Sequence, residues 1–208
     1  AVPVLRFETW LQMQKAPVTR LLMVLMGVVG LVQLLPGESI QAAGLVKPAY
    51  LEGEWWRLLT APFLHGHPLH FLMNVAALIY LGKRIEVFAR WPHVPLVFLF
   101  SACIGGEASV RFVSSTSIGA SGGLMGWLGF LLVFESLHSR LVPRPASRRL
   151  LAGVLLTGLI GIIGYKFIDN AAHAGGMIAG MLYAIVVFPK SSSPYRPSST
   201  ITDRIAGI

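Results

Sequence analysis

The sequence predicts an all-α membrane protein in which six transmembrane helices form a bundle and a long interfacial loop joins the first helix to the second. Of its 208 residues, 54% are hydrophobic and only 12% are charged, and the mean hydropathy is +0.68. A soluble domain of this size needs more polar surface than this composition supplies. Several stretches run for about 17 to 22 residues with almost no charge, which is the length needed to cross ~30 Å of hydrocarbon.

Hydropathy, interrupted by Pro, Gly and charged residues, predicts where each helix lies. The six spans are residues 18–35, 69–81, 94–109, 117–137, 150–165 and 170–188. Between the first and the second span, residues 36–68 contain Tyr50, Trp55, Trp56 and Phe63. Because aromatic side chains suit the membrane interface, we expect this segment to lie on the bilayer.

The distribution of Lys and Arg predicts the orientation of the helices. If six spans alternate, the N-terminal segment, the connections after spans two and four, and the C-terminal tail lie on one side. That side holds 13 of the 17 basic residues, namely Arg6, Lys15, Arg20, Lys83, Arg84, Arg90, Arg140, Arg144, Arg148, Arg149, Lys190, Arg196 and Arg204. We therefore expect both termini in the cytoplasm, with 1–17 as a cytoplasmic segment, 18–188 as the membrane domain and 189–208 as a flexible Ser/Pro-rich tail.

The formal net charge of +8 does not by itself indicate a nucleic-acid partner. The positive charges lie between apolar runs rather than along one amphipathic face, so the lipid bilayer is the expected partner. Cys103 is the only cysteine, and one cysteine cannot form an intrachain disulfide or a cysteine metal site. No cofactor and no metal are predicted, and the sequence leaves the oligomeric state open.

Four polar side chains are predicted at a similar depth near the outer ends of three spans. His70 and Asn74 lie in the outer half of the second span, Ser121 near the outer end of the fourth, and His173 near the outer end of the sixth. A polar side chain at membrane depth is costly unless it faces protein or water. This group therefore indicates a functional site.

Ser121 lies in a run of small residues, Gly119-Ala120-Ser121-Gly122-Gly123, that opens an apolar helix. Small neighbours leave the hydroxyl accessible, and unpaired backbone N–H groups at a helix start can stabilise an oxyanion. The alternative is an ordinary helix-packing surface, which small residues also form in membranes.

His173 is followed by Gly176 and Gly180, a ridge that brings the sixth span close to a neighbour. If that neighbour is the fourth span, His173 can take the proton of Ser121 during attack and return it to the leaving amine. The alternative is a packing histidine that bonds a backbone carbonyl.

Asp169 lies four residues before His173, a helical-neighbour spacing that also allows a Ser–His–Asp triad. We expect an N-cap instead, in which Asp169 or Asn170 accepts hydrogen bonds from the first turn of the sixth span.

His70 and Asn74 are four residues apart, so both project from one helix face, where they could donate hydrogen bonds to a developing oxyanion. The spacing of His65, His67 and His70 also allows a zinc site. We do not favour it, because no H-E-x-x-H pattern occurs and His65 and His67 flank a proline turn, where we expect them to brace the loop.

These motifs, in this order, resemble the signature of the rhomboid proteases over residues 54–188. The matching residues are Trp56-Arg57, His65, His70, Asn74, Tyr80-Leu81-Gly82, Glu86, Gly119-Ala120-Ser121-Gly122, Ala172-His173, Gly176 and Gly180. The resemblance implies a six-helix rhomboid bundle, which we expect in a bacterial inner (cell) membrane. It also implies a serine endopeptidase that cleaves transmembrane-helix substrates near the outer membrane face through an acyl-enzyme.

The resemblance assigns a role to each site residue. It makes Ser121 and His173 a catalytic dyad, and it makes His70, Asn74 and the backbone N–H of Ser121 an oxyanion hole. The supporting residues are His65, Gly119, Gly122, Gly176 and Gly180. One position departs from the family pattern, because Met125 stands where many relatives carry an aromatic residue that stacks on the histidine, and its contact with a ring has less fixed geometry.

Two other functions are open to this sequence. A rhomboid-like pseudoprotease would bind transmembrane helices without cleaving them, although inactive relatives usually lack one member of the dyad. A small transporter or channel would use the polar cluster as its pathway, but the spans hold few charged residues for that role.

Overall fold

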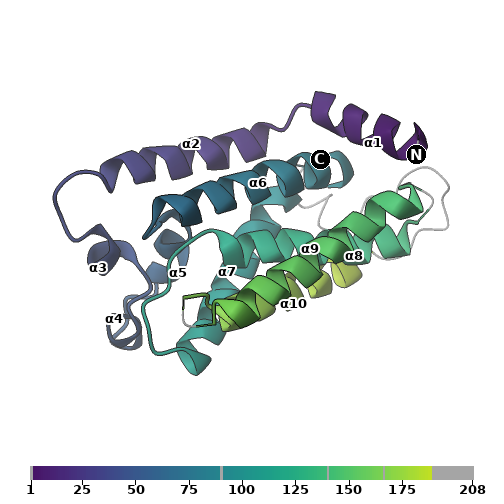
Figure 1. Cartoon of the computed structure of the whole chain (residues 1–208). Coiled ribbons are helices and arrows are strands. Elements are labelled where there is room, and N and C mark those ends of the chain that lie inside the picture. Colours follow the sequence, from purple (N-terminus) through teal and green to yellow (C-terminus); the bar gives the residue numbers. More distant parts are fainter. Residues whose placement is uncertain (1, 90, 140, 166, 189–208) are drawn as a thin grey trace.

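The computed structural model describes residues 2–89, 91–139, 141–165 and 167–188, and within these ranges the chain is helical apart from its loops and one isolated β-bridge. The elements are α1 (Val2–Met13), α2 (Pro17–Val32), α3 (Ser39–Ala43), α4 (Lys47–Leu51), α5 (Arg57–Thr60), the 3-10 helix η1 (Ala61–Phe63), α6 (Pro68–Phe88), α7 (His93–Phe112), α8 (Ser121–Leu137), α9 (Arg144–Ile163) and α10 (Asn170–Val187). The short helices α3, α4 and α5 gather at one end of the bundle, and α1 lies at the other end (Figure 1).

Each predicted span coincides with one long helix, but some of the predicted bounds are wrong. α6 continues to Phe88, beyond the predicted end at residue 81. α8 begins at Ser121 rather than at residue 117, because Gly119 has φ +110° and interrupts any helix before it. α1 was not predicted at all within the N-terminal segment. The predicted tail, 189–208, lies outside the described residues.

By length and composition, three helices in the part of the chain that the structure describes could cross a membrane: α7, α10 and the segment Ala146–Ile163 of α9. The pair Arg6–Met13 and Pro17–Val32, bent by 64°, is a further candidate. α8 has only 17 residues, and α6 carries three charged side chains toward its C-terminal end. These criteria therefore do not reach the predicted count of six.

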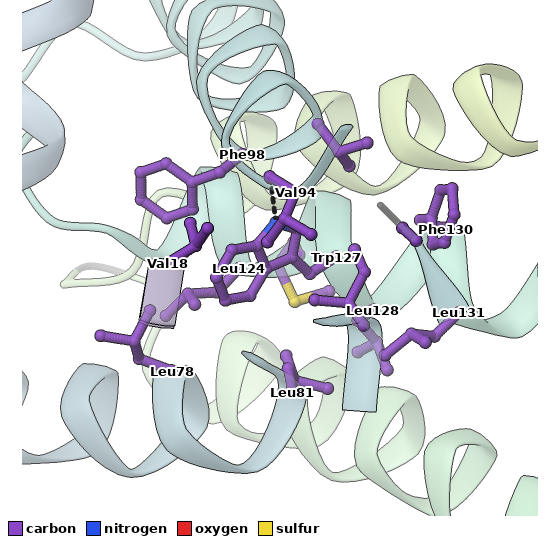
Figure 2. Packing of buried hydrophobic residues seen from close by; sticks show 14 of the residues in the cluster. Val18, Leu78, Leu81, Val94, Phe98, Leu124, Trp127, Leu128, Phe130 and Leu131 are labelled. Carbon is purple, nitrogen blue, oxygen red and sulfur yellow. Dashed lines mark hydrogen bonds between the residues drawn. The ribbon is translucent and has the colours of Figure 1, made fainter. Parts of the chain in front are cut away.

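α8 is the centre of the bundle and contacts α6, α7, α9 and α10. Every residue from Gly122 to Leu131 is buried. Trp127 is fully buried, and its indole N–H donates to the carbonyl of Val94 on α7 at 2.9 Å, so the bulky ring leaves no unpaired donor in the core. Figure 2 shows Trp127 between Phe98 and the α6 residue Leu81.

The helices around α8 expose apolar side chains outward. α9 exposes large aliphatic residues along one face, and so do α2 and α10. The large aliphatic residues of these three helices that are at least half exposed are Leu21, Val24, Val28, Leu31, Val32, Leu151, Leu155, Leu156, Leu159, Ile162, Ile163, Ile178, Leu182, Ile185 and Val186. Apolar faces of this extent suit contact with lipid tails rather than water.

A buried ion pair joins the helices at the end of α8 away from Ser121. Arg84 of α6 and Glu135 of α8 have side chains that are each 1% exposed, with Nε to Oε1 at 2.5 Å and Nη2 to Oε2 at 2.8 Å. Ser147 of α9 donates to Glu135 Oε2 at 2.8 Å, and Glu8 of α1 lies 3.8 Å from Arg84 Nη1. Four helices therefore meet at one charged cluster.

Candidate active site

Ser121 is the first residue of α8 and is partly buried. The preceding loop is fixed by a hydrogen bond from the Gly119 N–H to the Ala61 carbonyl at 3.0 Å. The first N–H groups of a helix have no intrahelical acceptor, so Ser121 lies at the end of α8 where backbone donors are available. The prediction that the small-residue run containing Ser121 opens an apolar helix is confirmed, with the helix beginning at Ser121 itself.

His173 lies in the first turn of α10, which packs directly on α8. A Cβ on Gly176 would lie 2.9 Å from the Gly122 carbonyl carbon, and one on Gly180 would lie 2.6 Å from that of Gly126. Small residues therefore let the two backbones touch, as the glycine ridge predicts.

The residues next to the two predicted catalytic side chains lie against each other. A Cβ on Gly122 would be 3.7 Å from the carbonyl oxygen of Ala172, so the residue after Ser121 meets the residue before His173. Across the described residues, no hydrogen bond joins the Ser121 hydroxyl to the His173 ring. Catalytic hydrogen bonds are often long before substrate binds, so the missing bond does not exclude a Ser121–His173 pair.

His70 and Asn74 of α6 reach the loop before Ser121. A Cβ on Gly119 would lie 2.5 Å from His70 Cε1, 2.8 Å from His70 Nε2 and 3.7 Å from Asn74 Nδ2, so only glycine fits there. Asn74 Nδ2 donates to the His70 carbonyl at 3.0 Å, which uses one of its two hydrogens and leaves the other for a ligand. Three of the predicted site segments therefore meet.

His65 supports this arrangement from the loop. Its ring packs edge-on against His70 and Phe71, at centroid distances of 5.1 and 5.2 Å, and its backbone bonds the Gln33 side chain at 3.0 and 3.1 Å. Both ring nitrogens are buried without a hydrogen-bond partner. Burial and the neighbouring His70 lower the pKa of His65 from its usual 6.5 to about 4, so the ring is neutral at neutral pH.

His67 caps α6, since its Nδ1 accepts from the Leu69 N–H at 3.1 Å. The expectation that His67 caps or braces the loop is confirmed, and the supporting role of His65 stays a prediction. Where the structure is described, no group of three His, Cys, Asp or Glu side chains is arranged to hold a metal ion.

Asp169 is the N-cap of α10, and its Oδ1 accepts from the Ala172 N–H at 2.9 Å. The predicted capping role is confirmed. Its other oxygen, Oδ2, accepts from the hydroxyls of Ser109 and Ser117.

Met125, four residues after Ser121, is buried in the main hydrophobic core.

The sequence patterns did not point to a polar cluster that includes Asp169. We call Lys47, Ser109, Ser117 and Asp169 the outer polar cluster. Lys47 is buried, and its Nζ donates to Ser109 Oγ at 2.7 Å and to Ser117 Oγ at 2.6 Å. One signal was available, because Lys47 is among the few basic residues on the side of the bundle predicted to face outward.

This helical bundle, apolar on its outer faces and polar at the end of α8 where α6 and α10 pack against it, defines an integral membrane protein with polar groups enclosed between its helices. Comparison with protein families agrees with this class. Residues 52–190 match the Rhomboid domain, and the chain belongs to the rhomboid family.

Relatives in the family include active and inactive proteins. The chain is 31% identical over 162 residues to Rhomboid protease GluP of Bacillus subtilis, covering 75% of this chain and 31% of the relative. It is 35% identical over 147 residues to RHOMBOID-like protein 4 of Arabidopsis thaliana, covering 68% and 36%. It is also 31% identical over 139 residues to Inactive rhomboid protein 1 of Bos taurus, covering 65% and 16%. The chain thus spans about a third or less of the length of these relatives.

Proposed function

We propose that this protein is an intramembrane serine endopeptidase that cleaves transmembrane-helix substrates near the outer membrane face. Ser121 is the nucleophile and His173 is the general base. The observation that carries the proposal is the direct contact of α8 and α10 at Gly122 and Ala172, the neighbours of these two residues. A serine and a histidine whose chain neighbours touch across two packed helices suit nucleophilic catalysis by a dyad.

In this mechanism His173 takes the proton of the Ser121 hydroxyl as its oxygen attacks the carbonyl carbon of the scissile bond. The carbonyl oxygen becomes an oxyanion, which the N–H of Ser121 and the side chains of His70 and Asn74 stabilise by hydrogen bonding. His173 then donates its proton to the leaving amine, and the C–N bond breaks to leave an acyl-enzyme. Water, deprotonated by His173, hydrolyses the ester and regenerates Ser121.

The membrane arrangement belongs to the same proposal. We assign six spans to α2, α6, α7, α8, α9 and α10, with residues 36–68 on the outer interface and both termini in the cytoplasm of a bacterial cell. The excess of Lys and Arg on one side supports this orientation. The short apolar run of α8 is compatible with spanning, because every residue from Gly122 to Leu131 is enclosed by protein rather than lipid. The charges near the end of α6 are compatible with spanning because Arg84 is buried in an ion pair with Glu135.

The test is labelling with a serine-reactive fluorophosphonate in detergent. Wild type is expected to label at Ser121, and Ser121→Ala is expected to lose the label while keeping its thermal unfolding midpoint. His173→Ala is expected to label at least about 10²-fold more slowly, since the base is gone. If wild type labels no more than Ser121→Ala, the enzyme proposal is wrong and helix binding without cleavage, as in a pseudoprotease, becomes the better account.

A further inference from the structure

The outer polar cluster joins four separate segments of the chain. Lys47 begins α4, Ser109 lies near the end of α7, Ser117 lies in the loop before α8, and Asp169 caps α10. Lys47 is 7% exposed and Ser109 is fully buried, so water screens the cluster only weakly. A lysine in such a place is unusual unless its ammonium group is paired.

The hydrogen bonds of the cluster run in one direction. Lys47 donates to both serine oxygens, at 2.7 and 2.6 Å, and both serine hydroxyls donate to Asp169 Oδ2. Each hydroxyl has one hydrogen, and the two serine oxygens also lie 2.7 Å apart. Both serines therefore accept from the ammonium, and at least one of them passes its hydrogen to the carboxylate. The cluster is therefore an ammonium–carboxylate pair bridged by two hydroxyls.

The cluster lies at the same distance along the chain from both predicted catalytic residues. Ser117 comes four residues before Ser121, and Asp169 comes four residues before His173. Asp169 also fixes the first turn of α10, because its side chain accepts from Ala172 N and its carbonyl accepts from His173 N at 3.0 Å.

The backbone also joins the interfacial segment to the loop before α8. Leu45 and Ser117 form an antiparallel bridge, with N–O distances of 3.0 and 3.2 Å, two residues before Lys47. The loop that leads to Ser121 is thus attached to the α4 segment by both backbone and side chain.

We propose that Lys47 is a positioning residue that sets the register of His173 relative to Ser121 by holding Ser117 and Asp169 together. The inference rests on the protease function proposed above and assigns its dyad a support in the interfacial segment. Lys47 does not touch the reacting atoms. Without it, the half-buried Asp169 carboxylate loses its counter-charge, and the loop before α8 is free to shift against the start of α10.

The charge on Lys47 gives the inference a measurable signature. Burial lowers the pKa of Lys47 from its usual 10.5 to about 8, and the Asp169 carboxylate opposes that shift. Other charged groups on the surrounding elements are held in sets without Lys47, namely Arg57 with Glu54, and Glu107 with Tyr50 and Arg111. Raising the pH through about 8 therefore removes the positive charge from the cluster.

The experiment compares wild type with Lys47→Met, Lys47→Arg and the control Arg111→Gln, which removes an exposed charge from the same predicted side. Fluorophosphonate labelling and reporter cleavage are measured from pH 6.5 to 10, and amide hydrogen exchange is measured at the start of α10. Lys47→Met is expected to lower the labelling rate and kcat by about 10-fold or more, with KM nearly unchanged, because a misplacement well under 1 Å already slows a positioned reaction.

Lys47→Met should also speed exchange at Ala172 and His173. Lys47→Arg should keep wild-type kcat at pH 7 and lose the fall in activity that wild type shows above about pH 8, because a guanidinium stays protonated. Arg111→Gln should match wild type in all three measurements.

The outcomes separate this inference from the proposed function. If wild type labels normally and Lys47→Met matches it in rate and exchange, the positioning role is wrong and the protease proposal stands. If wild type does not label but Lys47→Met still loosens the start of α10, the protease proposal fails while the structural coupling holds. Should Lys47→Met fail to fold, a pH profile of Lys47→Arg that superimposes on wild type overturns the inference.

Discussion

Gly176→Ala tests how closely catalysis depends on the contact between α8 and α10. The new Cβ would lie 2.9 Å from the Gly122 carbonyl carbon, with the carbonyl oxygen nearer still, whereas ordinary contacts begin at 3.4 Å. Both partners are backbone, so no side chain can rotate away, and the helices must separate by about 1 Å at this level. Because Gly122 adjoins Ser121 and Gly176 lies one turn from His173, the expected loss in kcat is about 10²-fold.

The assay is cleavage of a reporter transmembrane helix in liposomes, with thermal unfolding measured in parallel. Gly158→Ala in α9 is the matched control, because its Cβ would meet nothing within 4 Å and alanine favours helix by up to about 1 kcal/mol. The control should keep wild-type kcat and unfold at the same or a higher temperature. The reasoning is refuted if Gly176→Ala remains folded and retains more than half of the wild-type kcat.

Three further substitutions test parts of the fold that support the site. Wild-type His65 has a pKa of about 4 in the folded chain and 6.5 in the unfolded chain, so the unfolded chain binds the proton first and wild type loses stability as the pH falls from 7.5 to 5. His65→Asn should lose about 2 kcal/mol less unfolding free energy over the same pH range. Equal losses for the two proteins, measured in detergent, would contradict this. Arg84→Leu should lower the free energy of unfolding by about 3–5 kcal/mol, because it leaves the Glu135 carboxylate buried without its counter-charge. The double variant with Glu135→Leu should recover most of that loss. If the two single losses simply add in the double variant, the residues are not a coupled pair. Thr19→Val removes the 2.6 Å hydrogen bond from Thr19 Oγ1 to Glu86 and should lower the free energy of unfolding by about 1–3 kcal/mol. The kcat should stay unchanged. A loss of kcat without a loss of stability would contradict a purely structural role.

The long helices could be predicted because an apolar run is a local property of the sequence. Their ends were less accessible, because they depend on contacts from distant segments. α1 is an example: Glu8 pairs with Arg149 at 3.1 Å, and Phe7 packs near Trp10 and Arg84. The charged residues in these contacts look like solvent-exposed residues when read one at a time, so neither the helix nor its partners stood out.

The candidate site also has residues that short motifs predict and a residue that only distant contacts reveal. Short motifs contain Ser121, His173, His70 and Asn74. The structure packs α8, which carries Ser121, against α10 and against α6, which carry the other three residues. Lys47 has no motif, because its partners Ser109 and Ser117 lie 62 and 70 residues further along the chain. Only folding shows that a lysine, two serines and a helix cap share one partly buried network.

The shortness of α8 has a consequence for the depth of the reaction. Its 17 residues rise about 25 Å, roughly 5 Å less than the hydrocarbon thickness of ~30 Å. If α8 reaches the inner boundary, Ser121 lies below the outer one, where lipid supplies no water. A substrate helix keeps its peptide bonds paired and shielded at that depth. Under the proposed protease function, segments whose helix is weakened there by Gly, Pro or β-branched residues would unwind most easily into the polar end of the bundle. Local helix stability, as much as side-chain identity, would then select the bond that is cut.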